Sequence, residues 1–319
     1  MSYFRAHLDA LSGYQPGEQP QDDQYIKLNT NENPYPPSPL VIEKLFESLT
    51  HQRLSLYPPP LCDELRRQAS AVYGYPPDWI LVGNGSDELL SIVFRAFLGK
   101  GDRVLYPYPT YTLYRVLALL QEAECNEVAF ESDFTLPDIF FLESAKLKVI
   151  CNPNSPTGTF LPNVIIEDIL KNTSCPVVVD EAYVDFAEEN ALPLLKRYSH
   201  LIILRTLSKS FSLAGVRVGM CVAQPEIIQG LLKVKDSYNV SWLSQIAAIA
   251  ALQDIDYMKN NTELIKRTRE KFSQSMGKLG YSVLPSQANF VLVKRPGNNL
   301  KSEYHYLKQH RILVRYFPE

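Results

Sequence analysis

Three charged side chains stand just after apolar runs of this sequence, where a buried strand would end. Asp180 closes PVVVD, Lys209 follows LIIL, and Arg217 comes eight residues after Lys209. A carboxylate is costly to bury unless it meets a positive charge, so Asp180 requires a cationic partner. A lysine in such a position either forms a salt bridge or serves as an amine of lowered pKa that condenses with a carbonyl group. From the residue alone, both uses of Lys209 stay open.

The stretch NGSDE, which follows the apolar run WILVG, has the features of a phosphate site. Gly85 permits a tight turn, and Ser86 and Asp87 open an amphipathic helix. The free N–H groups at the N-terminus of a helix bind phosphate well. The ordinary alternative is that Ser86 or Asp87 only caps the helix.

Two further motifs supply polar side chains at expected strand ends. The loop NPNSPTG, residues 152–158, follows LKVIC, and from it Asn154 can project an amide. DEAYVDF places Tyr183 three residues after Asp180, although a helix-capping aspartate and a packed tyrosine would give the same pattern. Ligands of α/β proteins bind outside the carboxyl ends of the strands. The succession of these motifs, each after its own strand, therefore favours one shared site.

The elements that must position these residues alternate along the chain. From about residue 79, short apolar runs rich in β-branched residues alternate with amphipathic stretches, which predicts strand–helix units in a three-layer α/β/α sandwich. Residues 1–60 are rich in proline and tyrosine and predict an extended arm. From about residue 242 the chain turns helical and then mixed, which predicts a smaller α+β domain.

Composition narrows the class of protein. The 319 residues are 45% hydrophobic and 21% charged, with a net charge of −3, which excludes a disordered chain and disfavours extended contact with nucleic acid. The sequence shows neither a basic segment followed by a long apolar core nor an apolar run long enough to cross a bilayer, so we expect a cytoplasmic protein. The five cysteines form no C-x-x-C pair, and the five histidines show no metal-binding spacing. We expect reduced thiols, no catalytic metal and small-molecule chemistry.

The motifs together resemble the fold type I pyridoxal-phosphate aminotransferases, and within them the histidinol-phosphate aminotransferase branch. The resemblance runs over nearly the whole chain, through IKLNTNENPYPPSP, YPPP, GNGSDE, YPYPTYTLY, NPNSPTG, DEAYVDF, RTLSKSFSLAGVRVG and ILVRYF. It implies an α/β fold whose large domain holds a mixed, mostly parallel sheet. It further implies an arm at residues 1–40 that contributes to the small domain, a cofactor-binding domain at 41–240 and a small α+β domain at 241–319.

The resemblance assigns roles around the cofactor, pyridoxal 5'-phosphate. Lys209 would hold the cofactor covalently through its amine and later move a proton, and Asp180 would meet the pyridinium nitrogen. Tyr183 and Asn154 would donate hydrogen bonds to the phenolic oxygen of the ring. Tyr111 would stack on the ring face.

The cofactor phosphate would be held by two groups of residues. Ser86, Asp87 and Ser208 would supply donors, and Arg217 would form a charge-assisted clamp. Tyr57, from LYPPP, would reach the phosphate of a neighbouring subunit. The resemblance therefore implies a homodimer with shared active sites.

One departure from the family pattern concerns the ring oxygen. Relatives commonly carry Asn directly before P-T-G, whereas this chain has Ser155 there and Asn154 one place earlier. Either Asn154 reaches the ring oxygen through a shifted loop, or Ser155 leaves that hydrogen bond weaker.

Four residues match positions that line the substrate pocket in the resembling family: Tyr14, Tyr238, Asn239 and Arg315. Arginine binds carboxylate or phosphate through its planar fork, although Arg315 read alone could equally be a solvated charge. The family continues with a strand bearing a second anion-binding arginine, whereas this sequence ends at Glu319. We therefore expect the small domain to lack its final strand and helix.

The resemblance implies a transaminase of histidine biosynthesis. L-histidinol phosphate would give its amino group and leave as imidazole acetol phosphate, and 2-oxoglutarate would accept the group as glutamate. Threonine-phosphate decarboxylation and transamination of aromatic amino acids on the same scaffold stay as alternatives. A cofactor-binding protein without catalytic activity is a further one.

Overall fold

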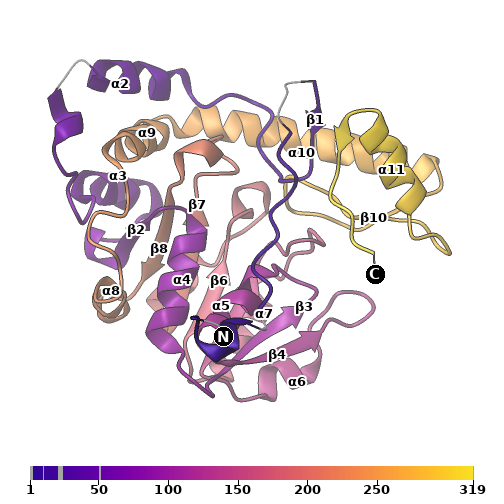
Figure 1. Ribbon diagram of the computed structural model, residues 1–319, viewed down its shortest axis with the longest axis horizontal. Coiled ribbons are helices and arrows are strands. Elements are labelled where there is room, and N and C mark those ends of the chain that lie inside the picture. The colour runs from indigo at the N-terminus through magenta and orange to yellow at the C-terminus, as the bar shows by residue number, and fades with distance from the viewer. Residues whose placement is uncertain (1–2, 10, 21–23, 50–51, 319) are drawn as a thin grey trace.

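A seven-stranded sheet forms the centre of the protein (Figure 1). The computed structural model describes residues 3–9, 11–20, 24–49 and 52–318. In spatial order the strands are β2 (Ile80–Gly83), β8 (Gly219–Ala223), β7 (Leu201–Thr206), β6 (Val177–Asp180), β5 (Leu147–Cys151), β3 (Arg103–Tyr108) and β4 (Glu124–Ala129). Strand β8 runs antiparallel to β2 and β7, and the remaining pairs are parallel. The expected mixed, mostly parallel sheet is confirmed.

Helices cover both faces of this sheet. Alternate side chains along β6 and β7 point into two separate apolar clusters, as the two-residue period of a strand requires. One cluster includes residues of α3 (Asp63–Tyr73), α6 (Asp138–Leu142), α7 (Asn163–Lys171) and α9 (Trp242–Gln253). The other includes residues of α4 (Ser86–Phe97), α5 (Leu113–Leu120) and α8 (Pro225–Leu232). The three-layer α/β/α arrangement is therefore also confirmed.

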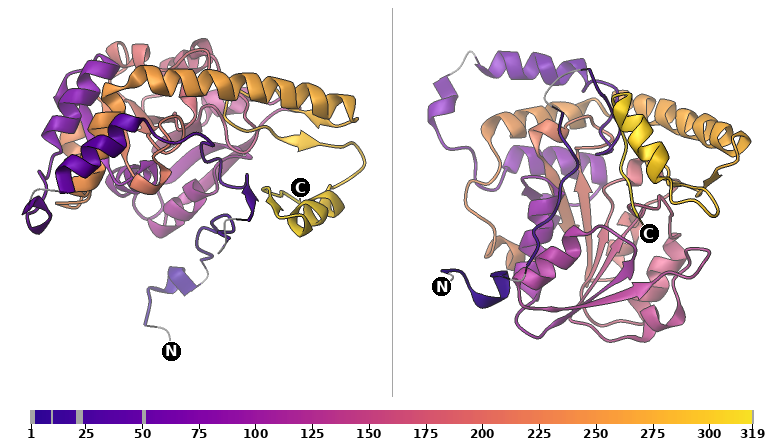
Figure 2. Two further views of the ribbon diagram at one scale, coloured as in Figure 1. Left: turned by 90° about the horizontal axis from the view of Figure 1, so that it is seen from above. Right: turned by 45° about the vertical axis from the view of Figure 1, so that its right-hand side comes forward.

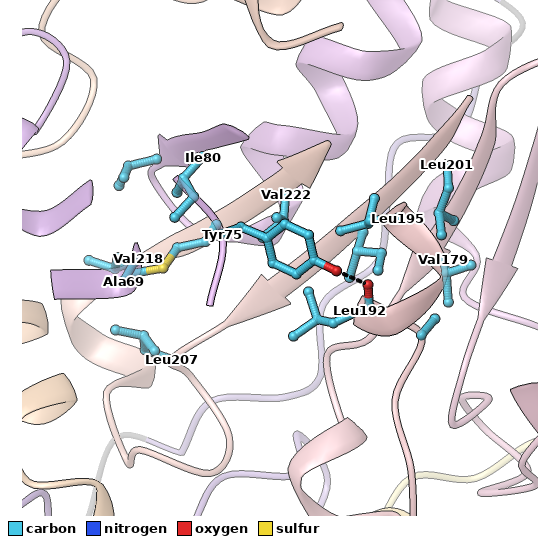
Figure 3. Close-up of a cluster of buried hydrophobic side chains, with 14 of the residues drawn as sticks. Ala69, Tyr75, Ile80, Val179, Leu192, Leu195, Leu201, Leu207, Val218 and Val222 are labelled. Carbon is cyan, nitrogen blue, oxygen red and sulfur yellow. Dashed lines mark hydrogen bonds between the residues drawn. The ribbon is translucent and has the colours of Figure 1, made fainter. Parts of the chain in front are cut away.

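The central strands are apolar because both of their faces are covered. Every residue of β5, β6 and β7 is buried. Figure 3 shows the first cluster around Tyr75, whose hydroxyl donates a hydrogen bond to the Leu192 carbonyl oxygen. Lys148 is the one charged residue of β5, and it is buried as well. Its Nζ donates to the carbonyl oxygen of Phe140 at 2.9 Å. A helical carbonyl of α6 thus satisfies an amine that has no access to water.

The chain after α9 forms a smaller group of elements beside the sheet (Figure 2). This group contains α10 (Ile255–Lys278), β9 (Ser282–Val283), β10 (Val293–Lys294), α11 (Lys301–Gln309) and β11 (Ile312–Leu313). Strands β9 and β10 pair antiparallel. Helix α9 itself packs on α3 and on α2 (Pro39–Leu49), so its apolar residues belong to the large core. The division of the chain at residues 40 and 240 stays a prediction.

The N-terminal segment connects the two groups of elements. Strand β1 (Ile26–Lys27) pairs parallel with β11, and the chain before it runs to α1 (Ala6–Asp9), which contacts α5 (Figure 1). Short 3₁₀ helices occupy Gln52–Ser55, Pro77–Trp79, Val184–Phe186, Leu192–Lys196 and Ala214–Val216. Within the described ranges, every helix is too short or too polar to span a bilayer.

Candidate active site

The carboxyl ends of β5, β6 and β7 lie side by side and bring the expected motifs together. Asp180 is the last residue of β6 and is in register with Cys151 of β5. Lys209 follows the end of β7 by three residues. Parallel strands present their carboxyl ends at one edge of the sheet, which is why motifs distant in sequence share one site.

Asp180 is a buried acid whose charge has no partner of opposite sign. Its side chain accepts hydrogen bonds from the Tyr114 hydroxyl at 2.8 Å and from the backbone N–H of Ala182 at 3.2 Å. Burial raises the pKa of Asp180 to about 6, although both hydrogen bonds lower it. In the described part of the chain, no basic side chain lies within 4.0 Å of this carboxylate. The site is therefore prepared for a cation that a ligand brings.

Lys209 carries a half-buried amine that bonds to the backbone. Its Nζ donates to the carbonyl oxygen of Thr30 at 2.8 Å, and among the residues described no carboxylate lies within 4.0 Å of it. Burial lowers the pKa of Lys209 to about 8, and the positive charge of Arg217 contributes to the lowering. Lys209 therefore loses its proton more readily than an ordinary lysine, and roughly a tenth of the amine is uncharged at pH 7, the form that a nucleophile or base requires. Among the residues described, Lys209 forms no salt bridge, which disfavours that alternative.

The loop that carries Lys209 rests on a buried ion pair. Arg205 Nε donates to Glu181 Oε2 at 2.7 Å, and the Arg205 guanidinium also pairs with Asp185 at 3.4 Å. The Ser210 hydroxyl donates to the second oxygen of Asp185. Ser210, for which the sequence suggests no role, thus anchors the residue directly after Lys209.

A cluster of hydrogen-bond donors that could hold an anion lies at the N-terminus of α4. Ser86 is the first residue of this helix, and the Arg217 guanidinium lies over the preceding turn, 3.2 Å from Asp87 Oδ2 and 3.3 Å from Ser208 Oγ. A Cβ atom on Gly85 would lie 2.5 Å from Arg217, and the φ of Gly85 is +88°. Helical N–H groups, two hydroxyls and a guanidinium together form an anion site.

A second layer of hydrogen bonds holds this turn, and sequence reasoning missed it. Glu88 Oε2 accepts from the backbone N–H of Asn84 at 2.5 Å and from Asn239 Nδ2 at 2.6 Å. Asn239 Oδ1 in turn accepts from Lys235 Nζ at 2.8 Å. Asn239, expected in the substrate pocket, therefore uses its side-chain amide to bond to Lys235 and to Glu88, which holds the turn before α4.

The side-chain amide of Asn154 bonds to its own loop and to the loop that follows β3. Its Oδ1 accepts from the Thr110 hydroxyl at 2.7 Å, and its Nδ2 donates to the Pro109 carbonyl at 3.0 Å and to the Thr157 hydroxyl at 2.8 Å. Ser155, by contrast, interacts with the Tyr183 hydroxyl. Both hydrogens of Asn154 Nδ2 are thus used within the protein, which favours the alternative in which Ser155 leaves the hydrogen bond to the ring oxygen weaker. Contact of Asn154 with the cofactor stays a prediction.

The aromatic residues expected at the site form two separate groups. Tyr111 packs edge-to-face on Tyr114 at 5.7 Å between ring centroids and on Tyr14 of the arm at 5.6 Å, and its hydroxyl donates to Asp87. Tyr57 instead stacks on Tyr238 at 4.4 Å, with 80% and 49% of these residues exposed. Tyr111 and Tyr14 thus join the anion site, while Tyr57 presents much of its surface to solvent.

The arm also meets Arg315 near the other end of the chain. Arg315 is exposed, and its guanidinium donates to the carbonyl oxygen of Gln15 at 3.2 Å. Gln15 follows Tyr14 in the sequence, so one short segment links Arg315 to the Tyr14–Tyr111 contact. Donors of the guanidinium not used by Gln15 are free to bind an anion.

Residues 29–35 are the largest part of the site that sequence reasoning missed. Asn31 Nδ2 donates to the Tyr183 hydroxyl at 3.2 Å. Asn33 Nδ2 donates to the carbonyl oxygens of Lys209 at 2.9 Å and Ser210 at 3.1 Å. The available signal was the run of asparagines in NTNENPY, which supported the resemblance but received no role.

Comparison with known proteins places this geometry in a family. The family model for aminotransferase class I and II matches residues 23–317. Histidinol-phosphate aminotransferase 1 of Trichormus variabilis is 44% identical over 321 residues, covering 100% of this chain and 91% of that protein. Histidinol-phosphate aminotransferase of Geotalea daltonii is 41% identical over 320 residues, covering 100% and 92%.

Solved structures agree with the arrangement of the elements. Histidinol-phosphate aminotransferase of Sinorhizobium meliloti in complex with pyridoxal-5'-phosphate superposes with a TM-score of 0.89 at 25% identity, over 99% of this chain and 89% of that chain. Aspartate aminotransferase of Thermus thermophilus with maleate gives 0.83 at 18% identity, over 98% and 91%, and is similar in fold alone.

Proposed function

Because the chain belongs to the class I and II aminotransferase family, we propose that it transfers the amino group of L-histidinol phosphate to 2-oxoglutarate. The chain is a pyridoxal-phosphate-dependent aminotransferase of fold type I. The observation that carries the choice of donor is the identity of 41–44% with histidinol-phosphate aminotransferases over the whole chain. The products are imidazole acetol phosphate and L-glutamate, in histidine biosynthesis.

The residues present fit the cofactor at three separate points. The uncompensated carboxylate of Asp180 suits a ring nitrogen that carries a proton. The turn before α4, with Arg217, suits a phosphate. The amine of Lys209 suits an aldehyde. When bound, the cofactor supplies an electron-accepting ring that stabilises negative charge at the α-carbon of the amino donor.

Proton transfer at the donor is the task of Lys209. Its Nζ would accept the proton of the donor's α-carbon and hold it, because a pKa near 8 lets the amine exist in both protonation states at neutral pH. Asp180 would pair with the ring nitrogen and favour its protonated form. The Tyr114 hydroxyl and the N–H of Ala182 orient the Asp180 carboxylate for that contact.

The donor pocket lies between the arm and the end of the chain. We assign Tyr14 to its wall and Arg315 to the anionic end of the donor, since the Arg315 fork is exposed beside the arm. Tyr238, which stacks on Tyr57 and not on Tyr14, is assigned to the part of the pocket next to Tyr57. Asn239 acts on the same pocket indirectly, because its amide fixes the loop that carries Tyr238.

We further propose a homodimer in which Tyr57 reaches the phosphate of the partner's cofactor. Tyr57 is 80% exposed, and exposed apolar side chains gather near it in sequence, at Ile42, Phe46, Leu49, Leu54 and Leu56. An apolar surface of this kind marks an interaction site. The free thiols of all five cysteines support a reducing compartment, and we propose the cytoplasm.

The donor is tested on the purified holoenzyme by visible absorbance. L-histidinol phosphate alone converts the bound aldehyde cofactor to its amine form and changes its absorbance, and 2-oxoglutarate restores the spectrum. Lys209→Ala abolishes both changes. If L-phenylalanine or L-threonine phosphate reacts and L-histidinol phosphate does not, the proposed donor is wrong while the family assignment stands.

Subunit mixing tests the shared site. Lys209→Ala and Tyr57→Ala variants, each impaired alone, are mixed and allowed to exchange subunits. A hybrid dimer has one site with Lys209 from one chain and Tyr57 from the other, so activity returns at that site. Activity that stays at the level of the separate variants contradicts a contribution of Tyr57 across the dimer.

A further inference from the structure

Residues 29–35 are fastened to the lysine that the reaction uses. The Thr30 carbonyl accepts from Lys209 Nζ at 2.8 Å, and Asn33 Nδ2 donates to the Lys209 and Ser210 carbonyls. Asn33 Oδ1 accepts from the backbone N–H of Tyr35 at 3.0 Å, which leaves the two amide hydrogens facing the two carbonyls. The segment is therefore held in one position relative to Lys209.

Asn31 lies between these two anchor points. Its φ is +56°, a left-handed conformation that asparagine tolerates better than most residues. Asn289 Nδ2 donates to the Asn31 carbonyl at 2.9 Å and so fixes the peptide from the opposite side. With its backbone held from both directions, Asn31 points its side-chain amide at the Tyr183 hydroxyl, 3.2 Å away.

This contact decides where the hydrogen of the Tyr183 hydroxyl can point. A phenolic oxygen has one hydrogen to donate and lone pairs that accept. Because Asn31 Nδ2 donates to the oxygen, the hydrogen of Tyr183 stays available for another acceptor. Ser155 interacts with the same oxygen, and burial raises the pKa of Tyr183, so the phenol keeps its proton.

We propose that Asn31 is a positioning residue that directs the hydroxyl hydrogen of Tyr183 toward the phenolic oxygen of the cofactor ring. The inference rests on the proposed placement of Tyr183 beside that oxygen. A hydrogen bond donated there stabilises the anionic oxygen and lowers the pKa at which the bound cofactor changes its absorbance. Asn31 thus acts on the cofactor through Tyr183, without touching it.

The test is a pH titration of the visible absorbance of the holoenzyme, in the wild type and in four variants. Tyr183→Phe raises the apparent pKa of the bound cofactor by about one unit, the shift expected for one lost hydrogen bond. Asn31→Gly removes the amide, keeps the left-handed backbone free of strain, and raises the pKa by about half a unit. Asn31→Asp raises it as much as Tyr183→Phe, because a carboxylate takes the phenolic hydrogen.

Asn29→Ala is the matched control. Asn29 stands in the same segment, but its side chain donates to the carbonyl of Glu18 in the arm at 2.9 Å. The absorbance titration of this variant is expected to match the wild type. Cofactor affinity, measured by absorbance on the cofactor-free protein, is expected to fall in Asn31→Gly and to stay unchanged in Asn29→Ala.

Different outcomes would refute the role of Asn31 and the placement of Tyr183. If Tyr183→Phe shifts the titration and both Asn31 variants titrate like the wild type, Asn31 does not direct the hydrogen and the inference is overturned. The same holds if Asn31→Asp shifts the pKa less than Asn31→Gly. If Tyr183→Phe leaves the titration unchanged, the placement of Tyr183 beside the ring oxygen is wrong.

Discussion

Replacing Asp180 by Asn is expected to stabilise the cofactor-free protein and to weaken cofactor binding. Burial raises the pKa of Asp180 from 3.8 in the unfolded chain to about 6 in the fold. The folded state therefore binds the proton more tightly than the unfolded state. The protonated Asp180 therefore stabilises the fold fully below pH 3.8, and this stabilisation is lost as the pH rises through 6. At pH 8 the ionised, buried carboxylate opposes folding.

The size of the effect follows from the two pKa values. A difference of about two units corresponds to ~3 kcal/mol at pH 8, and roughly half of it is gone at pH 5. The amide that replaces the carboxylate has one acceptor oxygen for two donors, the Tyr114 hydroxyl and the Ala182 N–H, which costs about 1 kcal/mol. We expect a net gain of about 2 kcal/mol at pH 8 from the difference between these two effects.

The measurement is urea unfolding of the cofactor-free protein at pH 5 and pH 8, followed by circular dichroism. Asp256→Asn is the control, because it removes the same charge from a side chain that is 92% exposed. Cofactor affinity of Asp180→Asn, measured by absorbance, is expected to fall by at least tenfold, because the ring nitrogen loses its carboxylate partner. Equal midpoints for wild type and Asp180→Asn at pH 8, or a gain that is the same at both pH values, would refute the reasoning.

Three further changes test the groups that support the site. Gly85→Ala places a Cβ 2.5 Å from Arg217 at a φ of +88° and should lower cofactor affinity at least tenfold by absorbance titration, whereas an unchanged affinity would show that the turn yields. Glu88→Ala removes the acceptor of two hydrogen bonds that hold the same turn, and should lower cofactor affinity about tenfold with little change in the thermal midpoint of unfolding. A large fall in the thermal midpoint with unchanged cofactor affinity would make Glu88 purely structural. Arg205→Met leaves Glu181 buried and unpaired and should cost about 3–5 kcal/mol of unfolding free energy, which Arg205→Met with Glu181→Met largely restores; no recovery in the double variant would contradict the pairing.

The ends of the strands were predictable because their signals are local. Apolar runs fixed the positions of Asp180 and Lys209, and the glycine turn before Ser86 marked the anion site. The sheet and its three layers followed from the same alternation, and the comparisons confirm the family, the enzyme class and the cofactor. The assignment of individual residues to the cofactor and the donor stays a prediction.

The contacts of Asn31 and Asn33 could not be derived from the sequence. Their partners stand 152 and 176 positions further along the chain, and no period or local motif encodes such a separation. Tyr114 was hidden for another reason, since a tyrosine on the apolar face of a helix reads as ordinary core. Asn154 shows the opposite problem, because a loop motif does not reveal whether an amide bonds to neighbouring loops of the protein or to a ligand.

The parallel pairing of β1 with β11 sets an order of events during synthesis of the chain. Ile26 and Lys27 leave the ribosome early, but their strand partners Ile312 and Leu313 are made only after all seven strands of the central sheet. Until then the asparagines after β1 have no strand to hold them over Lys209. In a nascent chain Lys209, Asp180 and the turn before α4 are therefore all made before β11 can pair with β1 and hold residues 29–35 beside Lys209.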